Sequence, residues 1–272
     1  MTNHYLHAFE LHQAPFSKEI GDAELWMPSS KQTLVDDLGE AVSERASILL
    51  VGEPGVGKTS VLRALRHKLE SGPYRLTYCH NATLGRRDFY RQLCLALGLH
   101  PSATAAAVFY AVSTHVADLA GDRLHPVFLL DEAHLLHQDT LDHLHILLNY
   151  EWDSRALLSL ILVGLPELEH RLALRRNRSL ASRIHHRFAI APLTADDTAE
   201  YVRVRLARAG CTREMFAADA LVMLHEATRG AMRDIDRIAT AALRLAARKR
   251  RRLIERDLLA RIVDLDAGRD HE

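Results

Sequence analysis

Gly52-Glu53-Pro54-Gly55-Val56-Gly57-Lys58-Thr59 is the most informative segment of this 272-residue chain. It follows the apolar run Ile48-Leu49-Leu50-Val51 and leads directly into a helical pattern from Ser60 onward. Glycines at this spacing let the backbone curl until its N–H groups converge, and the next helix adds the positive end of its dipole. The segment therefore predicts a P-loop that binds ATP through residues 52–60. Lys58 would reach the β- and γ-phosphates, and the Thr59 hydroxyl would ligate Mg²⁺.

Composition limits the other classes of function. The chain has 35 basic and 35 acidic side chains, so no global field draws it to nucleic acid or to an anionic membrane. Its three cysteines, Cys79, Cys94 and Cys211, fit free thiols in a reducing compartment. No apolar run reaches the length of about 18 residues that a spanning helix needs, and the N-terminus lacks a signal-peptide core. We expect a cytoplasmic protein without a membrane partner.

A second motif supports the first. The apolar run Pro126-Val127-Phe128-Leu129-Leu130 delivers Asp131 and Glu132, the pattern of a Walker B strand. Asp131 would bind Mg²⁺, directly or through water, and Glu132 would orient and deprotonate the attacking water. The alternative is an acidic helix start. Residues 131–134 also spell the box of one helicase superfamily, but such helicases need two RecA-like domains and this chain has room for one.

Four histidines, His134, His137, His143 and His145, follow this motif. A zinc site is conceivable there. However, the cluster has neither a cysteine pair nor a His-Glu-x-x-His pattern, so we expect a polar helix face instead.

Strands and helices alternate from residue 48 to residue 190, which implies an α/β fold with a parallel sheet and helices on both faces. The phosphate site then lies at the carboxyl edge of the strands. From Thr194, which forms a capping-box pattern with Asp197, the chain becomes all-helical. We predict an N-terminal segment at 1–45, an α/β core at 46–193 and a helical lid at 194–272. Leu6, Phe9, Pro15 and Phe16 either cover the adenine side of the nucleotide or cap the sheet edge.

Basic residues gather at three places after the core strands. No acidic residue interrupts residues 170–195, which carry six arginines, Arg171, Arg175, Arg176, Arg178, Arg183 and Arg187. Such arginines could act in trans on a neighbour's γ-phosphate, contact DNA phosphates or form a solvated face. Arg233 could swing over the nucleotide or pair with a local carboxylate such as Asp236. The basic run at 248–252 could complement a helix dipole or contact phosphates.

Taken together, these motifs resemble AAA+ ATPases of the ExeA/GspA type, which are similar to the transposition ATPases TnsC and TniB. The resemblance rests on Tyr5-Leu6-x-x-Phe9-x-Leu11 with Pro15-Phe16, the P-loop, residues 131–136, Val163-Gly164-Leu165-Pro166-Glu167-Leu168, Arg183 with Arg187, and Arg229-Gly230-x-x-Arg233. It covers nearly the whole chain.

The resemblance implies an AAA+ core with a five-stranded parallel sheet, a helical lid, and a homo-oligomeric ring or helical filament that hydrolyses ATP. Arg183 and Arg187 match the arginine-finger region, and Arg233 matches sensor 2. Leu165 stands where the ExeA-type motif usually carries Gln at sensor 1. Because leucine cannot hydrogen-bond the lytic water, this difference argues against efficient hydrolysis. Met232 replaces the usual Pro, which a helix start tolerates.

Two functions follow from the resemblance. In the first, the protein regulates DNA transposition: it oligomerises on duplex DNA, largely without sequence preference, and recruits or activates a transposase or target-selection protein. In the second, it is an assembly ATPase of a secretion or pilus system, like ExeA. Secretion ATPases of this type usually continue into a membrane span and a peptidoglycan-binding region. Because this chain stops at Glu272 with neither, we expect the transposition role, with a stand-alone ATPase in another pathway as a third option.

Overall fold

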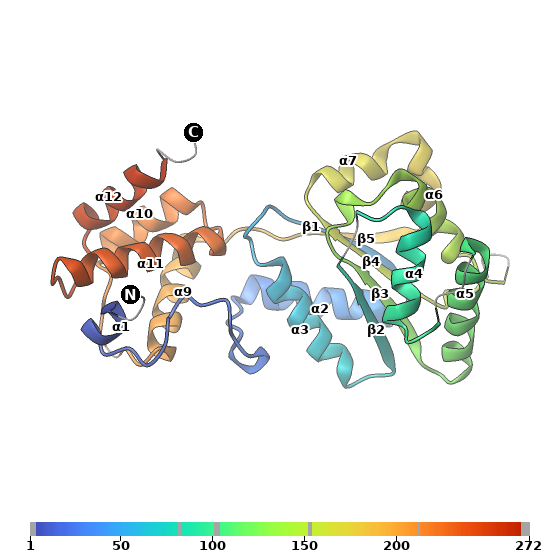
Figure 1. The fold of residues 1–272 in the computed structure, drawn as a ribbon, viewed down its shortest axis with the longest axis horizontal. Coiled ribbons are helices and arrows are strands. Elements are labelled where there is room, and N and C mark those ends of the chain that lie inside the picture. Colours follow the sequence, from blue (N-terminus) through green and yellow to red (C-terminus); the bar gives the residue numbers. More distant parts are fainter. Residues whose placement is uncertain (1–3, 81–82, 101–103, 152–153, 212, 268–272) are drawn as a thin grey trace. The chain divides into compact units, whose positions relative to one another are not determined.

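The structure, a computed structural model, describes residues 4–80, 83–100, 104–151, 154–211 and 213–267. The chain forms two compact units (Figure 1). The sheet unit comprises residues 29–53 and 59–190, and the helical unit comprises residues 1–28, 54–58 and 191–272. The predicted segment 1–45 is therefore divided, because its first 28 residues belong to the helical unit and its last 17 to the sheet unit.

The sheet unit is built on five parallel strands in the order β2-β3-β4-β1-β5. These are β1 (Ser47–Val51), β2 (Tyr74–Cys79), β3 (His125–Leu130), β4 (Ser159–Gly164) and β5 (Ile184–Ala189). Every residue of β1, β3 and β4 is buried, as expected for inner strands covered on both faces, whereas the edge strands β2 and β5 are partly exposed. The predicted parallel α/β sheet is thus confirmed.

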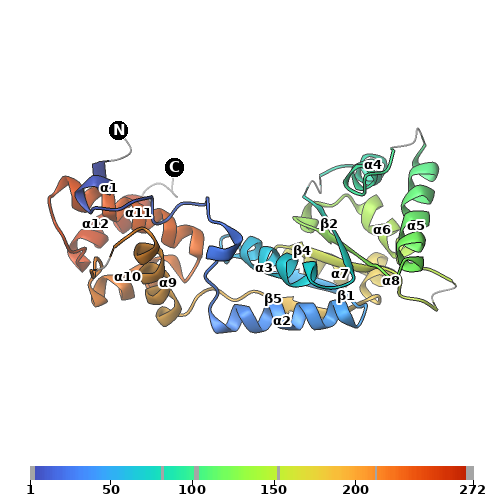
Figure 2. The same cartoon turned by 90° about the horizontal axis from the view of Figure 1, so that it is seen from below.

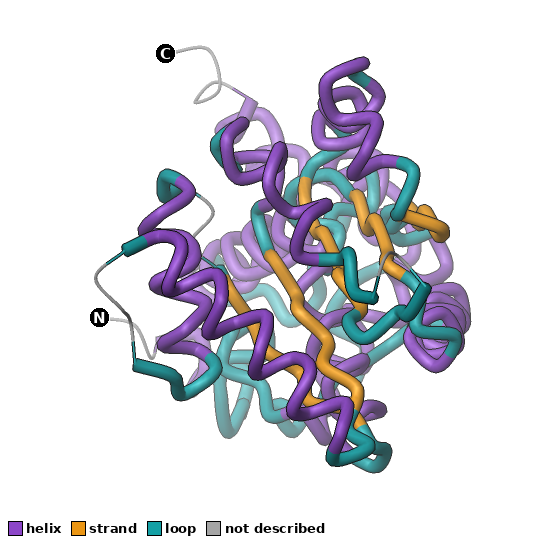
Figure 3. The backbone as a smooth tube through the Cα atoms, turned by 90° about the vertical axis from the view of Figure 1, so that its right-hand side faces the viewer, coloured by secondary structure: helices purple, strands orange, loops and turns teal. Residues whose placement is uncertain are grey.

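Helices cover both faces of this sheet, and the strands run between them (Figure 3). On one face lie α2 (Ser29–Ser43) and α3 (Lys58–Glu70), joined by the ion pair of Lys68 with Asp36 at 2.6 Å. On the other, alternate strand side chains such as Leu49, Phe128 and Leu160 share a core with the helices that follow β2, β3 and β4. These are α4 (Arg86–Ala96) and α5 (Ala105–Gly121), which lie side by side in Figure 2, η2 (Ala133–Leu135), α6 (Gln138–Leu147), α7 (Glu167–Ala173), η3 (Arg175–Asn177) and α8 (Arg178–Ala181).

The helical unit consists of α1 (His4–Ala8), η1 (Asp22–Glu24), α9 (Ala195–Arg208), α10 (Ala218–Thr228), α11 (Met232–Arg248) and α12 (Arg256–Ala267). The predicted capping box at the start of α9 is present, since the Thr194 hydroxyl accepts from the Asp197 N–H at 3.1 Å and the Asp197 carboxylate accepts from the Thr194 N–H at 3.2 Å. Among the described residues, no helix is long and apolar enough to cross a membrane. All three cysteines are buried free thiols, as predicted.

The N-terminal apolar residues pack inside the helical unit. Phe9 and Phe16 are buried in its core, and Leu6 packs against that core. The buried Arg205 of α9 holds the segment in place by donating to the carbonyls of Pro15 and Ser17, both at 2.6 Å. These side chains were expected to cover the adenine or cap the sheet edge. The structure instead uses them as part of the helical core, since α9 and α11 supply the apolar surface that they cover.

One buried carboxylate sits in the same region. The Tyr201 hydroxyl donates to Asp236 of α11 at 2.7 Å, and Arg205 donates to the Tyr201 oxygen at 3.0 Å. Burial raises the pKa of Asp236 to about 6, although the hydrogen bond from Tyr201 and the charge of Arg205 act in the opposite direction. The protonated form of Asp236 is therefore favoured by folding.

We expect Asp236→Asn to change how stability depends on pH. A folded pKa of about 6 lies above the ordinary value of 3.8. The stability that Asp236 contributes to the wild type is therefore fully present below about pH 3.8 and is lost as the pH rises through 6. Asparagine keeps an acceptor for Tyr201 and does not titrate. The unfolding free energy of the variant minus that of the wild type should therefore rise by about 2–3 kcal/mol between acidic and mildly alkaline pH. Urea denaturation at several pH values measures this, and a difference independent of pH would contradict the assignment.

Candidate active site

The P-loop joins β1 to α3. Gly55 and Gly57 have φ angles of +82° and +97°, a conformation that side chains other than glycine rarely adopt. The N–H of Gly52 donates to the carbonyl of Gly164 at 3.1 Å, which ties the loop to the end of β4. Helix α3 begins at Lys58, so Lys58, Thr59 and Ser60 occupy its first turn. The local structure is thus the strand, glycine-rich loop and helix that phosphate binding requires.

Arg233 lies beside the P-loop within the helical unit. Its backbone N–H donates to the Gly55 carbonyl at 3.3 Å, and a Cβ added at Gly55 would lie 3.0 Å from the Cβ of Arg233. The Asp236 carboxylate, its predicted alternative partner, accepts from Tyr201 instead. The exposed side chain of Arg233 thus starts from the backbone next to the loop, and its sensor 2 role stays a prediction.

Asp131 and Glu132 follow β3 at the same edge of the sheet as the P-loop and Gly164. Both oxygens of the Asp131 carboxylate are oriented by neighbours: Oδ1 accepts from the Glu132 N–H at 2.9 Å, and Oδ2 accepts from the Tyr78 hydroxyl at 2.9 Å. Each oxygen keeps a lone pair for a further ligand. Carboxylate and hydroxyl oxygens are the donors that Mg²⁺ prefers, so Asp131 and Thr59 fit the metal assigned to them.

Tyr78 is a residue of the site that sequence reasoning missed. It lies in β2, in register with Leu129 of β3, and reaches across the strand end to Asp131. Burial and the hydrogen bond to Asp131 raise the pKa of Tyr78 far above its ordinary value, so the hydroxyl stays a donor at any physiological pH. The available signal was a tyrosine next to last in a strand that neighbours the Walker B strand.

His134 belongs to the site as well. Its Nδ1 accepts from the N–H of Leu165 at 3.4 Å, and its Nε2 lies 3.5 Å from the Glu132 carboxylate. The predicted polar histidine face is therefore wrong for His134, which lies in η2. It is also wrong for His143, whose ring packs edge-on against Tyr90 and Phe109 with centroids 5.4 and 5.0 Å away. Among the described residues, no group of three potential metal ligands of the His, Cys, Asp and Glu type gathers.

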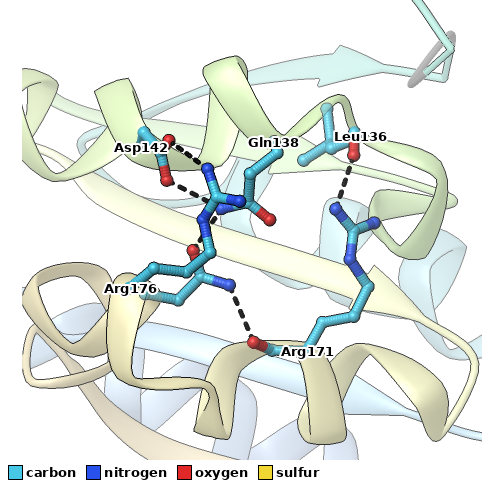
Figure 4. A network of polar contacts seen from close by, with 6 residues as sticks. Leu136, Gln138, Asp142, Arg171 and Arg176 are labelled. Carbon is cyan, nitrogen blue, oxygen red and sulfur yellow. Dashed lines mark hydrogen bonds and ion pairs between the residues drawn. The ribbon is translucent and has the colours of Figure 1, made fainter.

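The arginines of residues 170–195 bind different partners. Arg171 of α7 donates to the carbonyls of His134 and Leu136, and Arg176 pairs with Asp142 at 2.9 Å. Figure 4 shows the bond to Leu136 and the pair with Asp142. Gln138 and Asn177 continue this network between α6 and η3. Arg171 therefore connects the loop after Glu132 to α7, and Arg176 connects η3 to α6, roles that none of the three sequence interpretations included.

Arg183 and Arg187, the two finger candidates, lie in different settings. Arg187 is in the middle of β5, in register with Leu49, and pairs with Glu169 at 3.7 Å. Arg183 precedes β5, whose first residue Ile184 pairs with Ser47 at the amino end of β1. The length of β1, about 13 Å for four steps of a strand, separates Arg183 from the edge that carries the P-loop. Arg183 therefore lies near the amino edge of the sheet, away from the edge that carries its own P-loop.

The basic run at 248–252 ends α11. Its members are exposed, and Arg251 pairs with Asp257 at 2.9 Å, an interaction that holds the pKa of this carboxyl below its ordinary value. The run thus has local acidic partners as well as exposed charge.

Fold and site together define a P-loop protein of the AAA+ class, and comparison with known proteins agrees. Residues 40–172 match the family model described as an AAA domain. The chain is 32% identical over 271 residues to general secretion pathway protein A of Aeromonas hydrophila, a match that covers 98% of this chain and 49% of that protein. The chain thus contains an AAA domain and resembles the ExeA/GspA type, and it spans about half the length of this curated relative.

Solved structures show the same fold. Cdc6p from Pyrobaculum aerophilum is 18% identical with a TM-score of 0.67, over 88% of this chain and 67% of that chain. Drosophila ORC bound to DNA is 17% identical with a TM-score of 0.71, over 96% and 65%. The RuvB Holliday junction branch migration motor of Thermotoga maritima is 15% identical with a TM-score of 0.58, over 93% and 73%. These likenesses concern the fold. None of these comparisons shows the expected similarity to TnsC and TniB.

We expect Tyr78→Phe to weaken the use of Mg²⁺. Phenylalanine keeps the ring but removes the donor to Asp131, so the carboxylate loses one of the two bonds that orient it. The half-saturating Mg²⁺ concentration for binding of a fluorescent ATP analogue should rise by about 3- to 10-fold, as one lost hydrogen bond allows. Tyr110→Phe, at a tyrosine 72% exposed on α5, is the matched control. Equal Mg²⁺ dependence of Tyr78→Phe and wild type would contradict the role of the hydroxyl.

Proposed function

We propose that this chain is an ATPase of the ExeA type that serves the assembly of a secretion or pilus system. The observation that carries this proposal is the 32% identity to general secretion pathway protein A along 98% of the chain. The P-loop, Asp131 and Glu132 supply the parts of a hydrolytic site at one edge of the sheet. Because the chain spans about half of that relative, the position of its last residue does not separate this role from the other two.

The transposition role, which was the first expectation, has less support. The likeness to the DNA-bound ORC structure concerns the fold, at 17% identity. The arginines of α7 and η3 that were candidates for DNA contact include two, Arg171 and Arg176, that bind groups of their own unit. The ExeA-type role therefore accounts better for the comparisons, and DNA binding becomes an outcome that the experiments must distinguish.

In the proposed reaction, each side chain has one task. The N–H groups around Gly55 and Gly57, with Lys58, hold the phosphates of ATP. Thr59 and Asp131 would hold Mg²⁺, which neutralises the charge that develops on the phosphate oxygens. The Glu132 carboxylate orients the attacking water and takes its proton. Arg233 contributes positive charge from the start of α11, beside the P-loop.

A complete site requires a second subunit in this proposal. Arg183 lies at the amino edge of the sheet, away from its own P-loop, so its charge can stabilise the transition state only across an interface. Subunits that each offer a P-loop and an Arg183 join head to tail, which generates a ring or a helical filament.

Two variants should separate nucleotide binding from hydrolysis. Lys58→Ala should lose binding of ATP, because the loop loses its cation. Glu132→Gln should bind ATP but turn over at least 100-fold more slowly, since the amide cannot accept the proton of water. Binding of a fluorescent analogue and phosphate release measure the two effects. ATP turnover by Lys58→Ala at the wild-type rate would show that the P-loop is not the hydrolytic site.

The same variants test the biological role. In a host that lacks the gene, the wild-type chain should restore protein export or pilus assembly, and Lys58→Ala should not. A parallel gel-shift assay with duplex DNA and a non-hydrolysable ATP analogue addresses the transposition role. Nucleotide-dependent coating of DNA, together with normal export in the deletion strain, would overturn the assembly role in favour of the transposition role.

Arg183→Ala should abolish turnover but leave the P-loop intact. Lys58→Ala has the opposite defect, so each variant supplies what the other lacks. A one-to-one mixture should recover up to about a quarter of wild-type activity, the share of random head-to-tail interfaces that combine an intact P-loop with an intact Arg183. Phosphate release by the mixture measures this. Failure of the mixture to exceed either variant alone would contradict action in trans.

A further inference from the structure

The side chain of His134 connects two backbone segments that meet at the carboxyl edge of the sheet. It contacts the N–H of Leu165, just after β4, and the carboxylate of Glu132, just after β3. The His134 side chain is 13% exposed, whereas that of Glu132 is 47% exposed. A glutamate this exposed has many accessible rotamers unless a neighbour restricts it, and fixing one of them costs conformational entropy.

The hydrogen-bond pattern assigns the tautomer of His134. Because the Leu165 N–H is a donor, Nδ1 must be the acceptor, and the proton of the neutral ring then lies on Nε2. Nε2 is the atom that faces the Glu132 Oε2, at 3.5 Å. The backbone of Leu165 thereby turns His134 into a hydrogen-bond donor directed at Glu132.

Two further features keep the ring in this place. The guanidinium of Arg171 donates to the carbonyls of His134 and Leu136, which fixes the backbone of the loop (Figure 4 shows the second of these bonds). Gly164 leaves room for the ring: an added Cβ there would lie 3.2 Å from both the backbone nitrogen and the Nδ1 of His134. The position of His134 is therefore determined by three elements, namely β4, η2 and α7.

We propose that His134 is a positioning residue that holds the Glu132 carboxylate in the orientation needed to activate water. The inference rests on the proposed ATP hydrolysis and adds a residue to it. The distance of 3.5 Å between Nε2 and the carboxylate is long for a hydrogen bond, and such contacts tighten when substrate completes a site. Loss of the ring leaves nucleotide binding intact, because His134 acts on Glu132 and not on the P-loop.

Three substitutions of His134 test this arrangement. His134→Leu removes both contacts. His134→Asn keeps an acceptor at the place of Nδ1, and His134→Gln places an amide donor near the position of Nε2. Turnover should fall by about 10- to 100-fold in the Leu and Asn variants, the range that a misplaced catalytic group produces. The Gln variant should recover most of the rate. The dissociation constant of a fluorescent ATP analogue and the melting temperature should stay close to wild type in all three.

His137→Gln is the matched control, since His137 is an exposed residue of the same loop whose side chain makes no capping bond to α6. A Leu variant as fast as wild type would overturn the inference. So would a Gln variant as slow as the Leu variant, or a slower rate that is matched by weaker nucleotide binding. A wild-type rate no higher than that of Lys58→Ala is a separate result, because it would overturn the proposed ATPase activity itself.

Discussion

The site depends on one constraint, the parallel pairing of β1 with β4 and of β4 with β3. In register, Val51 lies opposite Gly164, and Leu130 lies opposite Leu162. Because parallel strands end at one edge, the P-loop, Asp131 with Glu132, and Leu165 all leave the sheet within a few residues of one another. The tasks proposed for Thr59, Asp131 and Glu132 all use this edge. The burial of β1, β3 and β4 on both faces makes the pairing costly to change, so the same apolar side chains that form the core also fix the geometry of the site.

The sequence predicted those features that depend on a local pattern. The P-loop needs positive φ angles at Gly55 and Gly57, and only glycine adopts them at low energetic cost. The two glycines therefore indicate the loop conformation directly. The Walker B pattern, a fully apolar strand followed by two carboxylates, is likewise recognised from adjacent residues. Tyr78 and His134 escaped prediction because their roles depend on which strands become neighbours. A tyrosine in an edge strand contacts Asp131 only once β2 pairs with β3, and no spacing along the chain encodes that contact.

The arginine-rich segment shows why charge counted along a sequence is a weak guide to function. Arg171, Arg176 and Arg187 lie within 17 residues, yet they bind backbone carbonyls, Asp142 and Glu169 respectively. Their acidic or carbonyl partners come from other elements, so a stretch without acidic residues is not a stretch without partners. The contacts of the N-terminal segment are likewise set by the fold and not by its position in the sequence. The two interpretations of Phe9 and Phe16 placed them over the adenine or at the sheet edge, but the buried Arg205 holds their segment to α9.

The backbone of Glu132 has a strained conformation that helps to organise the site. It has φ +52° and ψ +34°, a left-handed conformation that costs a residue other than glycine about 1–3 kcal/mol. The fold compensates locally, since the Glu132 N–H donates to Asp131 and the Leu135 N–H donates to the Glu132 carbonyl at 2.9 Å. This turn directs the chain from β3 into η2, and it thereby brings His134 back toward the carboxylate of Glu132. A relaxed, right-handed residue at this position would continue the chain in another direction and separate the two side chains. The strain at Glu132 is thus part of what places His134 between the ends of β3 and β4.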